Sequence, residues 1–395
     1  MGSDVEQGRW TALYSFPIED SIMPSRRFSS LTKKWPAIAA ALALTVAVPA
    51  LPAHADDDAY QVHNLVSDGF LPADHVDQNL VNAWGIAFNA TGPVWIANNG
   101  SGTSTLYDGT GTPASLVVQI PTPSANTGGN PTGIVFNLVN AATSFPVSAA
   151  GKTGGSRFIF ATEGGVIAGW SPTVDGTHAI VAVDNSSKNT VYKGLAIGAN
   201  GSNQLIYATD FHNARIDVFD NTFAPVTLAA GAFVDAKIPA GYAPFGIQAL
   251  GGNIFVTYAK QDADAHDDVH GPGLGFVDVY DPNGVMLDRV ATHGRLNAPW
   301  GIALAPAGFG KFSNSLLIGN FGDGRVNVYD PKNYTPRGQL EGVQIDGLWG
   351  LAFGNGFAGQ LVNTLFFTAG PGDEAHGLYG RIDATAQSNH HDHDD

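Results

Sequence analysis

The sequence has no cysteine among its 395 residues and few basic side chains. Without cysteine, disulfides and thiolate metal sites cannot form, so stability must come from packing and backbone hydrogen bonds. The 19 Lys and Arg residues stand against 35 Asp and Glu, which gives a formal net charge of -16. A surface of this sign repels the phosphates of nucleic acid and attracts cations. We therefore expect no nucleic-acid partner.

Long apolar runs and helical periodicity are missing after residue 55. No later segment is apolar enough to span a bilayer, and none keeps a 3.6-residue period beyond a turn or two. Three catalytic motifs are absent as well: the G-x-S-x-G serine elbow, the G-x-x-x-x-G-K phosphate loop and the H-E-x-x-H zinc helix. Hydrolysis by a nucleophilic serine is therefore disfavoured.

The N-terminal segment has the pattern of a signal peptide. Basic residues between Arg26 and Lys34 precede an apolar run from Trp35 to Leu51, and the small-residue pattern Ala53-His54-Ala55 follows. We predict cleavage after residue 55 and export to the periplasm or the extracellular space. The sequence leaves open whether translation starts at Met1 or at Met23.

The rest of the chain repeats one pattern six times. Each copy opens with a glycine and an apolar run, continues with a second apolar run and a hairpin, and usually closes on Tyr-Asp or Phe-Asp. The opening glycines, 48 to 61 residues apart, are Gly85, Gly133, Gly194, Gly246, Gly301 and Gly350. Repeats of this size built from strands alone are typical of propeller blades. The 49 glycines and 23 prolines supply the tight turns of an all-β fold.

We predict a six-bladed β-propeller with four-stranded blades. The sixth copy contains only three strands, whereas residues 60–66 form a strand without a blade of its own. That N-terminal strand should complete the last blade and leave no open edge in the ring. The predicted domains are residues 1–55 as signal peptide and preceding segment, 56–383 as the propeller, and 384–395 as a disordered His/Asp-rich tail.

The repeat resembles the NHL repeat of β-propellers, most clearly in NAPWGIAL with LLIGNFGDGRVNVYD and in KGLAIG with LIYATDFHNARIDVFD. The resemblance covers residues 60–383. Within that group, the chain resembles the exported, largely uncharacterised bacterial branch. Six-bladed relatives of similar build include gluconolactonases and paraoxonase-like lactonases, which hold a divalent cation over the central channel. The resemblance implies the architecture, while propellers as a class host many unrelated activities.

The candidate site lies on the face that carries the hairpins between second and third strands, which we call the top face. The second strands end there on Asn98, Glu163, Asp210, Tyr258, Asn320 and Ala369. Asn98, Glu163, Asp210 and Asn320 offer the oxygen ligands that Ca²⁺ prefers. An Asp or Asn at this position can instead accept backbone N–H groups of its own hairpin. Glu163 fits that alternative less well because its hairpin is shorter.

Histidines gather in the same segments. Six of them fall on the predicted top face: His75, His212, His266, His270, His293 and His376. Imidazole binds Zn²⁺, Cu²⁺ and Ni²⁺, and carboxylates such as Asp267, Asp268 and Glu374 are close in sequence. We add His266 and His270 to the metal candidates and predict His212 or His376 as the group that activates water. The alternative is that polar loops simply collect His and Asp.

Three functions remain open on the sequence. The first is an exported propeller that binds a divalent cation, Ca²⁺ or a transition metal, and with it a small molecule, an extracellular protein or a glycan. The second is a metal-dependent lactonase or ester hydrolase, in which the cation polarises a carbonyl and a histidine activates water. The third is a structural surface protein. The aromatics before four of the opening glycines line a ligand site or pack between blades.

Overall fold

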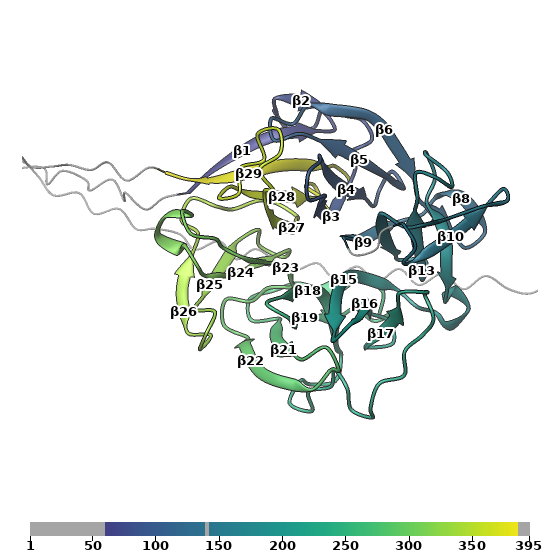
Figure 1. Ribbon diagram of the computed structural model, residues 1–395. Helices are drawn as coiled ribbons and strands as arrows, with labels where there is room; N and C mark the ends of the chain where they lie inside the picture. The colour runs from purple at the N-terminus through teal and green to yellow at the C-terminus, as the bar shows by residue number, and fades with distance from the viewer. Residues whose placement is uncertain (1–59, 139–141, 386–395) are drawn as a thin grey trace, which may run out of the picture. The chain divides into compact units, whose positions relative to one another are not determined.

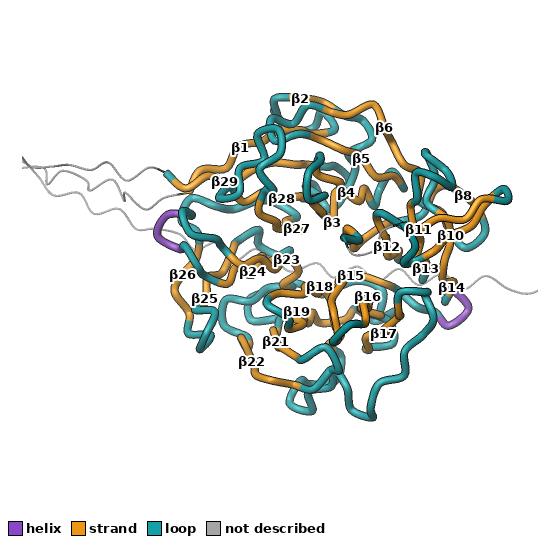
Figure 2. Tube along the Cα trace, in the orientation of Figure 1, coloured by secondary structure: helices purple, strands orange, loops and turns teal. Residues whose placement is uncertain are grey.

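The computed structural model describes residues 60–138 and 142–385, in which almost every regular element is a strand (Figures 1 and 2). The exceptions are two single 3₁₀ turns, Ser186–Lys188 and Gly310–Phe312. The predicted signal peptide and the tail beyond residue 385 lie outside the described residues. Six antiparallel sheets follow one another along the chain, which confirms the predicted six-bladed β-propeller.

Each blade is numbered by its order in the chain. Blade 1 consists of β3 (Ala83–Phe88), β4 (Val94–Asn98), β5 (Thr103–Tyr107) and β6 (Pro113–Gln119). Blade 2 consists of β9 (Pro131–Phe136), β12 (Phe158–Thr162), β13 (Val166–Trp170) and β14 (Ile180–Asp184). Blade 3 consists of β15 (Tyr192–Asn200), β16 (Asn203–Asp210) and β17 (Arg215–Asp220).

The second half of the ring is built in the same way. Blade 4 consists of β18 (Tyr242–Leu250), β19 (Asn253–Gln261), β21 (Phe276–Tyr280) and β22 (Met286–Thr292), with the short β20 (Asp268–Val269) beside β19. Blade 5 consists of β23 (Pro299–Leu304), β24 (Leu316–Asn320), β25 (Val326–Tyr329) and β26 (Pro336–Gln339). Blade 6 consists of β27 (Leu348–Phe353), β28 (Leu365–Ala369), β29 (Leu378–Ala384) and β1 (Tyr60–Ser67), with β2 (His75–Val76) at its edge.

Two hairpins lie outside this scheme. β7 (Pro121–Thr122) pairs with β8 (Ala125–Gly128) in the link between blades 1 and 2. The segment between β9 and β12 of blade 2 contains β10 (Pro146–Ala149) paired with β11 (Lys152–Gly155).

The N-terminal strand closes the ring as predicted. β1 pairs antiparallel with β29, with Tyr60 opposite Ala384 and Ser67 opposite Leu378. Figure 1 shows the two strands side by side, one purple and one yellow, although they come from opposite ends of the fold. Without β1, the last blade would expose an unpaired edge beside the buried side chain of Ile382.

Blade 3 departs from the prediction of four strands in every copy. After β17 the chain forms a bridge between Phe219 and Pro225 and two backbone hydrogen bonds, from the Asp220 N–H to the Ala224 carbonyl oxygen and from the Val226 N–H to the Val218 carbonyl oxygen. The fourth strands of blades 1 and 5 also start at a proline, with Pro113 opposite Tyr107 and Pro336 opposite Tyr329, so Pro225 alone does not prevent a fourth strand in blade 3. The irregular segment that leads to β18 packs Val226, Leu228 and Phe233 against the core of blades 3 and 4.

The repeated glycines bring the innermost strands together. Five of the six opening glycines face the carbonyl oxygen of the residue before the next opening glycine around the ring. A Cβ atom at Gly350 would lie 2.7 Å from the carbonyl oxygen of Trp84, and a Cβ atom at Gly194 would lie 2.7 Å from that of Phe245. These distances leave no room for a side chain. The glycine period in the sequence therefore reflects close backbone approach between neighbouring blades.

Aromatic side chains close the top of the central channel. Trp84 and Trp349 stack with ring centroids 3.7 Å apart, and Phe321 stacks on the other side of Trp349 at 4.1 Å. Phe245 and Trp300 complete this group, which we call the aromatic plug. Trp84, Phe245 and Trp349 are fully buried, so the plug packs the propeller rather than exposing flat faces for a ligand.

Candidate functional site

A buried lysine lies over the aromatic plug. Lys193, at the start of β15, has a side chain that is only 2% exposed, and its ammonium is 5.1 Å from the ring centroid of Trp84. The ammonium pairs with the Glu163 carboxylate and donates to Asp267 Oδ1 at 2.9 Å. Two carboxylates and an aromatic face thus satisfy the buried charge.

Glu163 reaches the ring axis from blade 2. It follows β12 in a tight hairpin, and its backbone N–H donates to the carbonyl oxygen of Asn130 at 3.0 Å. Its second carboxylate oxygen, Oε2, accepts a hydrogen bond from Asn99 Nδ2 at 2.8 Å. The short hairpin therefore directs the side chain inward, where it joins residues of blades 1 and 3.

The long loop of blade 4 supplies two further carboxylates. Within it, β20 pairs back onto β19, with Asp268 opposite Gln261, and this pairing directs the adjacent acids toward the axis. Asp267 is held by Lys193 on one side and by His266 Nδ1, 3.0 Å from Asp267 Oδ1, on the other. Asp267 is 63% exposed and His266 47%, so the cluster opens to solvent here.

Asp268 is the buried member of the pair. Its side chain is only 7% exposed, and its Oδ2 atom has no hydrogen-bond partner in the described part of the chain. Burial raises the pKa of Asp268 to about 7, against the opposing attraction of the Lys193 charge. An unpaired carboxylate oxygen in this environment is costly unless a proton or a cation joins it.

Blade 6 contributes Glu374 from the loop between β28 and β29. Its Oε2 atom accepts a hydrogen bond from Asn82 Nδ2 at 2.6 Å, and Asn82 Oδ1 in turn accepts one from Trp349 Nε1 at 3.2 Å. Burial raises the pKa of Glu374, and the neighbouring Glu163 and Asp267 act in the same direction, while the Asn82 bond and Lys193 oppose them. Four carboxylates thus surround one ammonium. We call Lys193, Glu163, Asp267, Asp268 and Glu374 the central cluster.

Two members of this cluster and the adjacent His266 have the spacing of a metal site. Glu163, His266 and Asp267 each offer one ligand atom, and these atoms all lie within 4.8 Å of one another. The set contains two carboxylate oxygens and one imidazole nitrogen, a mixture that suits Ca²⁺ or Mn²⁺ through its oxygens and Zn²⁺ through its nitrogen. Of the predicted metal residues, Glu163 and His266 are brought together here.

The other predicted oxygen ligands are engaged in their own blades. Asn98 Nδ2 donates to the hydroxyls of Thr103 and Thr105, at 3.1 and 3.0 Å. Asp210 pairs with Arg215 at 3.0 Å and accepts hydrogen bonds from the hairpin that follows it. Asn320 donates to the Arg295 carbonyl oxygen and to Asp323 Oδ1. Each residue ends its second strand as expected, but only Asp210 accepts a backbone N–H of its own hairpin, from Asn213. Asn98 Oδ1 is buried and has no hydrogen-bond partner among the described residues.

The predicted histidines do not converge on one point. His270 Nδ1 is 3.7 Å from Asp268 Oδ2, at the edge of the central cluster. His376 Nδ1 is 2.8 Å from Asp68 Oδ2, and its ring stacks on Phe70 at 3.8 Å. His212 is half-buried, and no hydrogen bond to its imidazole is present within residues 60–138 and 142–385. His266 alone belongs to the group with metal-ligand spacing.

Sequence reasoning missed Lys193. The residues before the six opening glycines are Trp84, Thr132, Lys193, Phe245, Trp300 and Trp349. Lys193 is the single charged member of this inner ring, and a charge at a position that is apolar in most copies is a signal of a buried ionic site. The sequence contains no comparable signal for the buried position of Asp268, because that position depends on the pairing of β20 with β19.

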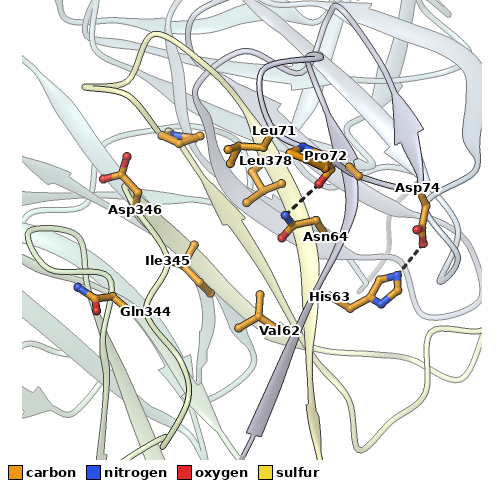
Figure 3. A pocket seen from close by; sticks show the side chains of 12 residues that line it. Val62, His63, Asn64, Leu71, Pro72, Asp74, Gln344, Ile345, Asp346 and Leu378 are labelled. Atoms are coloured by element: carbon orange, nitrogen blue, oxygen red, sulfur yellow. Dashed lines mark hydrogen bonds and ion pairs between the residues drawn. The ribbon is translucent and has the colours of Figure 1, made fainter.

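Two larger hollows lie away from the central cluster. Figure 3 shows one of about 710 Å³ beside β1, where Val62, Ile345 and Leu378 line an apolar floor. At its rim, His63 Nε2 is 2.7 Å from Asp74 Oδ2, and both side chains are well exposed. The other, about 490 Å³, is apolar and is lined by the ends of the first strands, opposite the plug. The central cluster lines neither hollow, because its own side chains fill its centre.

Fold and site together define a six-bladed β-propeller with a lysine-centred acidic cluster over its axis. The chain belongs to the same family as two proteins of Acanthamoeba polyphaga mimivirus. It is 32% identical to Uncharacterized protein L690 over 307 residues, which covers 74% of this chain and 78% of the viral protein. It is 31% identical to Uncharacterized protein R648 over 334 residues, covering 82% and 80%. No model of an established protein family matches the chain.

Solved structures with similar architecture are far more distant in sequence. Virginiamycin B lyase from Staphylococcus aureus is 14% identical with a TM-score of 0.42, covering 82% of this chain and 99% of the lyase. The PQQ-bound aldose sugar dehydrogenase from Streptomyces coelicolor is also 14% identical, with a TM-score of 0.48 and coverage of 82% and 98%. At these values the likeness bears on neither activity nor ligand. No helix in the described residues is long and apolar enough to cross a membrane.

Proposed function

We propose that this protein binds a divalent cation on its top face, with Glu163, Asp267 and His266 as ligands. The observation that carries the proposal is the spacing of these three residues, whose ligand atoms all lie within 4.8 Å of one another. Next to Asp267, the buried Oδ2 atom of Asp268 has no hydrogen-bond partner among the described residues and lies 3.7 Å from His270 Nδ1. Four carboxylates face one ammonium, so the cluster has an excess of negative charge that a cation would neutralise. The exposed Asp267 and His266 provide an entry path for the ion.

The cluster suits an ion better than a larger ligand. Its side chains are already in contact through the Lys193 pairs and the Asn99 and Asn82 hydrogen bonds. A hydrated ion can exchange water for the exposed oxygens at its rim, whereas an organic substrate would need space that these contacts fill. We therefore place cation binding first and keep a small molecule, an extracellular protein or a glycan as a second component that contacts the bound ion.

The hydrolase alternative has less support. It would use an ion over the channel bound by Asn98, Glu163, Asp210 and Asn320, with water activated by His212 or His376. Asp210 pairs with Arg215, Asn320 donates a hydrogen bond to Asp323 of its hairpin, and His376 is paired with Asp68. A lactonase based on this chain would therefore have to bind its cation through Glu163 and the blade 4 loop instead.

We further propose that the protein is exported. The support is the basic, apolar and small-residue pattern of residues 26–55, which has the order of a secretory signal. An extracellular or periplasmic location would expose the top face to Ca²⁺ and other free cations. The resemblance to the NHL group fits this proposal, since the branch that the repeat resembles is exported.

The proposal is tested by cation-dependent stability of the full chain. The tail residues His390, His391 and His393 are first changed to Ala, because imidazoles there would bind transition metals independently of the fold. Melting temperatures are then measured with Ca²⁺, Mn²⁺ and Zn²⁺ for this parent and for Glu163→Gln. A cation bound only by the folded state adds about 2.7 kcal/mol at a hundred times its Kd. We expect at least one ion to stabilise the parent and to have little effect on the variant.

Asp74→Asn serves as the matched control. It removes the same charge from the exposed pair with His63 in the hollow of Figure 3, outside the group with metal-ligand spacing. The control should keep the full response to the ion. If no ion stabilises the parent, or if Glu163→Gln responds as strongly as Asp74→Asn does, the proposed site is wrong.

A further inference from the structure

We propose that Lys193 is a built-in competitor that keeps the cation site weak and reversible. The inference rests on the proposed function, because it concerns regulation of the same site. The Lys193 ammonium already contacts Glu163 and Asp267, which are two of the three residues with metal-ligand spacing. A divalent ion and the ammonium would therefore compete for the same two carboxylates.

The competitor cannot leave by moving its backbone. Lys193 lies between residues paired with β16, where Tyr192 faces Asp210 and Gly194 faces Thr209. Its carbonyl oxygen also accepts a hydrogen bond from Trp300 Nε1 at 2.9 Å. The alkyl chain is buried, so only the ammonium end can shift over the face of Trp84. The competing charge thus stays in the site at a fixed effective concentration.

The charge count explains why a cation should still bind. Lys193 pairs with Glu163 and Asp267, while Asp268 and Glu374 lie in the same cluster, so its carboxylates outnumber its ammonium. A divalent ion at the exposed edge, near His266, would supply the missing positive charge while Lys193 keeps part of its contact with Glu163. Repulsion between the ion and the ammonium then lowers the affinity without abolishing it.

A lysine in this position also protects the apo protein. Removing it would leave Glu163 and Asp267 without their ammonium, and unpaired carboxylates in a buried cluster are destabilising. The same substitution frees both oxygens for an ion. Loss of Lys193 should therefore make the fold depend on bound cation, which a merely structural salt bridge would not do.

The experiment compares Lys193→Met with the parent that lacks the tail histidines. Methionine keeps most of the unbranched chain that packs over Trp84 and removes only the charge. Binding of Ca²⁺ and Mn²⁺ is measured by titration calorimetry, and melting temperatures are recorded with and without each ion. We expect binding to Lys193→Met to be at least about tenfold tighter. We also expect a lower melting temperature without the ion and a larger rise with it.

Two control variants separate this effect from general electrostatics. Lys188→Met removes one positive charge from the 3₁₀ turn that precedes β15, where Lys188 Nζ donates to Asn185 Oδ1 at 2.9 Å. Lys193→Arg keeps the charge at the site. Neither control should bind the ions more tightly than the parent.

The outcomes distinguish the inference from the proposed function. If the parent binds an ion and Lys193→Met binds it no more tightly, the competitor role fails and the cation site stands. If the parent binds none and Lys193→Met binds, the lysine does compete, and the proposed function of the natural protein fails. If neither protein binds, both are wrong. If Lys193→Met does not fold alone, refolding in each ion decides, because the inference requires the ion to restore the native fold.

Discussion

Lys193 Nζ and Asp267 Oδ1 lie 2.9 Å apart, although the two residues come from different blades and are 74 positions apart in sequence. The bond joins the first strand of blade 3 to the long loop of blade 4, and Glu163 adds blade 2 to the same point. Circular closure of the ring is what makes such a meeting possible, since it directs every first strand and every top hairpin toward one axis. The central cluster is a product of that closure.

Closure of the ring is tested at Gly350. A Cβ atom there would lie 2.7 Å from the Trp84 carbonyl oxygen and 2.7 Å from Thr368 Oγ1, and only movement of the backbone could relieve the contact. We expect Gly350→Ala to lower the free energy of unfolding by about 1 to 3 kcal/mol or more, as overpacking does. Urea unfolding measures the change. Gly176→Ala, at a glycine with open space around it, should stay within about 0.5 kcal/mol of the parent.

A structural role for Asp210 predicts a different behaviour from that of Glu163. Asp210 is fully buried, pairs with Arg215 and accepts hydrogen bonds from the Val191 N–H and from Asn213. Asp210→Ala leaves these donors unpaired, and we expect a loss of about 1 to 3 kcal/mol in unfolding free energy. Its response to Ca²⁺ or Mn²⁺ should equal that of the parent. A lost response to the ion, with stability unchanged, would show that Asp210 is a ligand as the sequence suggested.

The pH dependence of stability is tested at Asp278 in blade 4. Its carboxyl group is fully buried, and together with Asp235 it shares the single guanidinium of Arg289. Burial raises the pKa of Asp278 to about 6, and Arg289 opposes this only in part. The folded state therefore holds the proton more tightly than the unfolded chain does. The resulting stability is present below about pH 4 and is lost as pH rises to about 6.

Asp278→Asn isolates this contribution. The pKa of Asp278 is about 2 units higher in the folded protein than in the unfolded chain. This difference contributes at most about 3 kcal/mol to the free energy of unfolding. Unfolding free energies are measured for the parent and the variant at pH 4.5 and pH 7.5. We expect the parent to lose more stability than the variant between these values. Parallel losses in the two proteins would mean that the Arg289 pair keeps Asp278 ionised throughout.

Much of the fold was predictable because its causes are local and repeated. The opening glycines recur since each inner strand must approach the next one closely, so their spacing alone counts six blades. The unpaired strand at residues 60–66 and the incomplete sixth copy indicated how the ring closes. Blade 3 was predicted with one strand too many, because its sequence after β17 resembles that of blades 1 and 5, where a strand does start at Pro113 and at Pro336.

The site was predicted less completely because its contacts are not local. The sequence predicted that Glu163 and His266 lie on the same face. In the structure, their ligand atoms lie within 4.8 Å of each other. The sequence could not separate Glu163 from Asp210 and Asn320, which occupy the same position in the repeat but form hydrogen bonds with side chains of their own hairpins, Asn213 and Asp323. Lys193 was visible as an exception within the inner ring. Its partners depend on how the blade 4 loop folds onto β19, which no period in the sequence encodes.

The most direct measurement is anomalous diffraction from crystals of the protein soaked in Mn²⁺. The account predicts one manganese peak within bonding distance of the carboxylates of Glu163 and Asp267 and of the imidazole of His266. A peak located instead among Asn98, Asp210 and Asn320, or the absence of any peak at the central cluster at millimolar Mn²⁺, would contradict it.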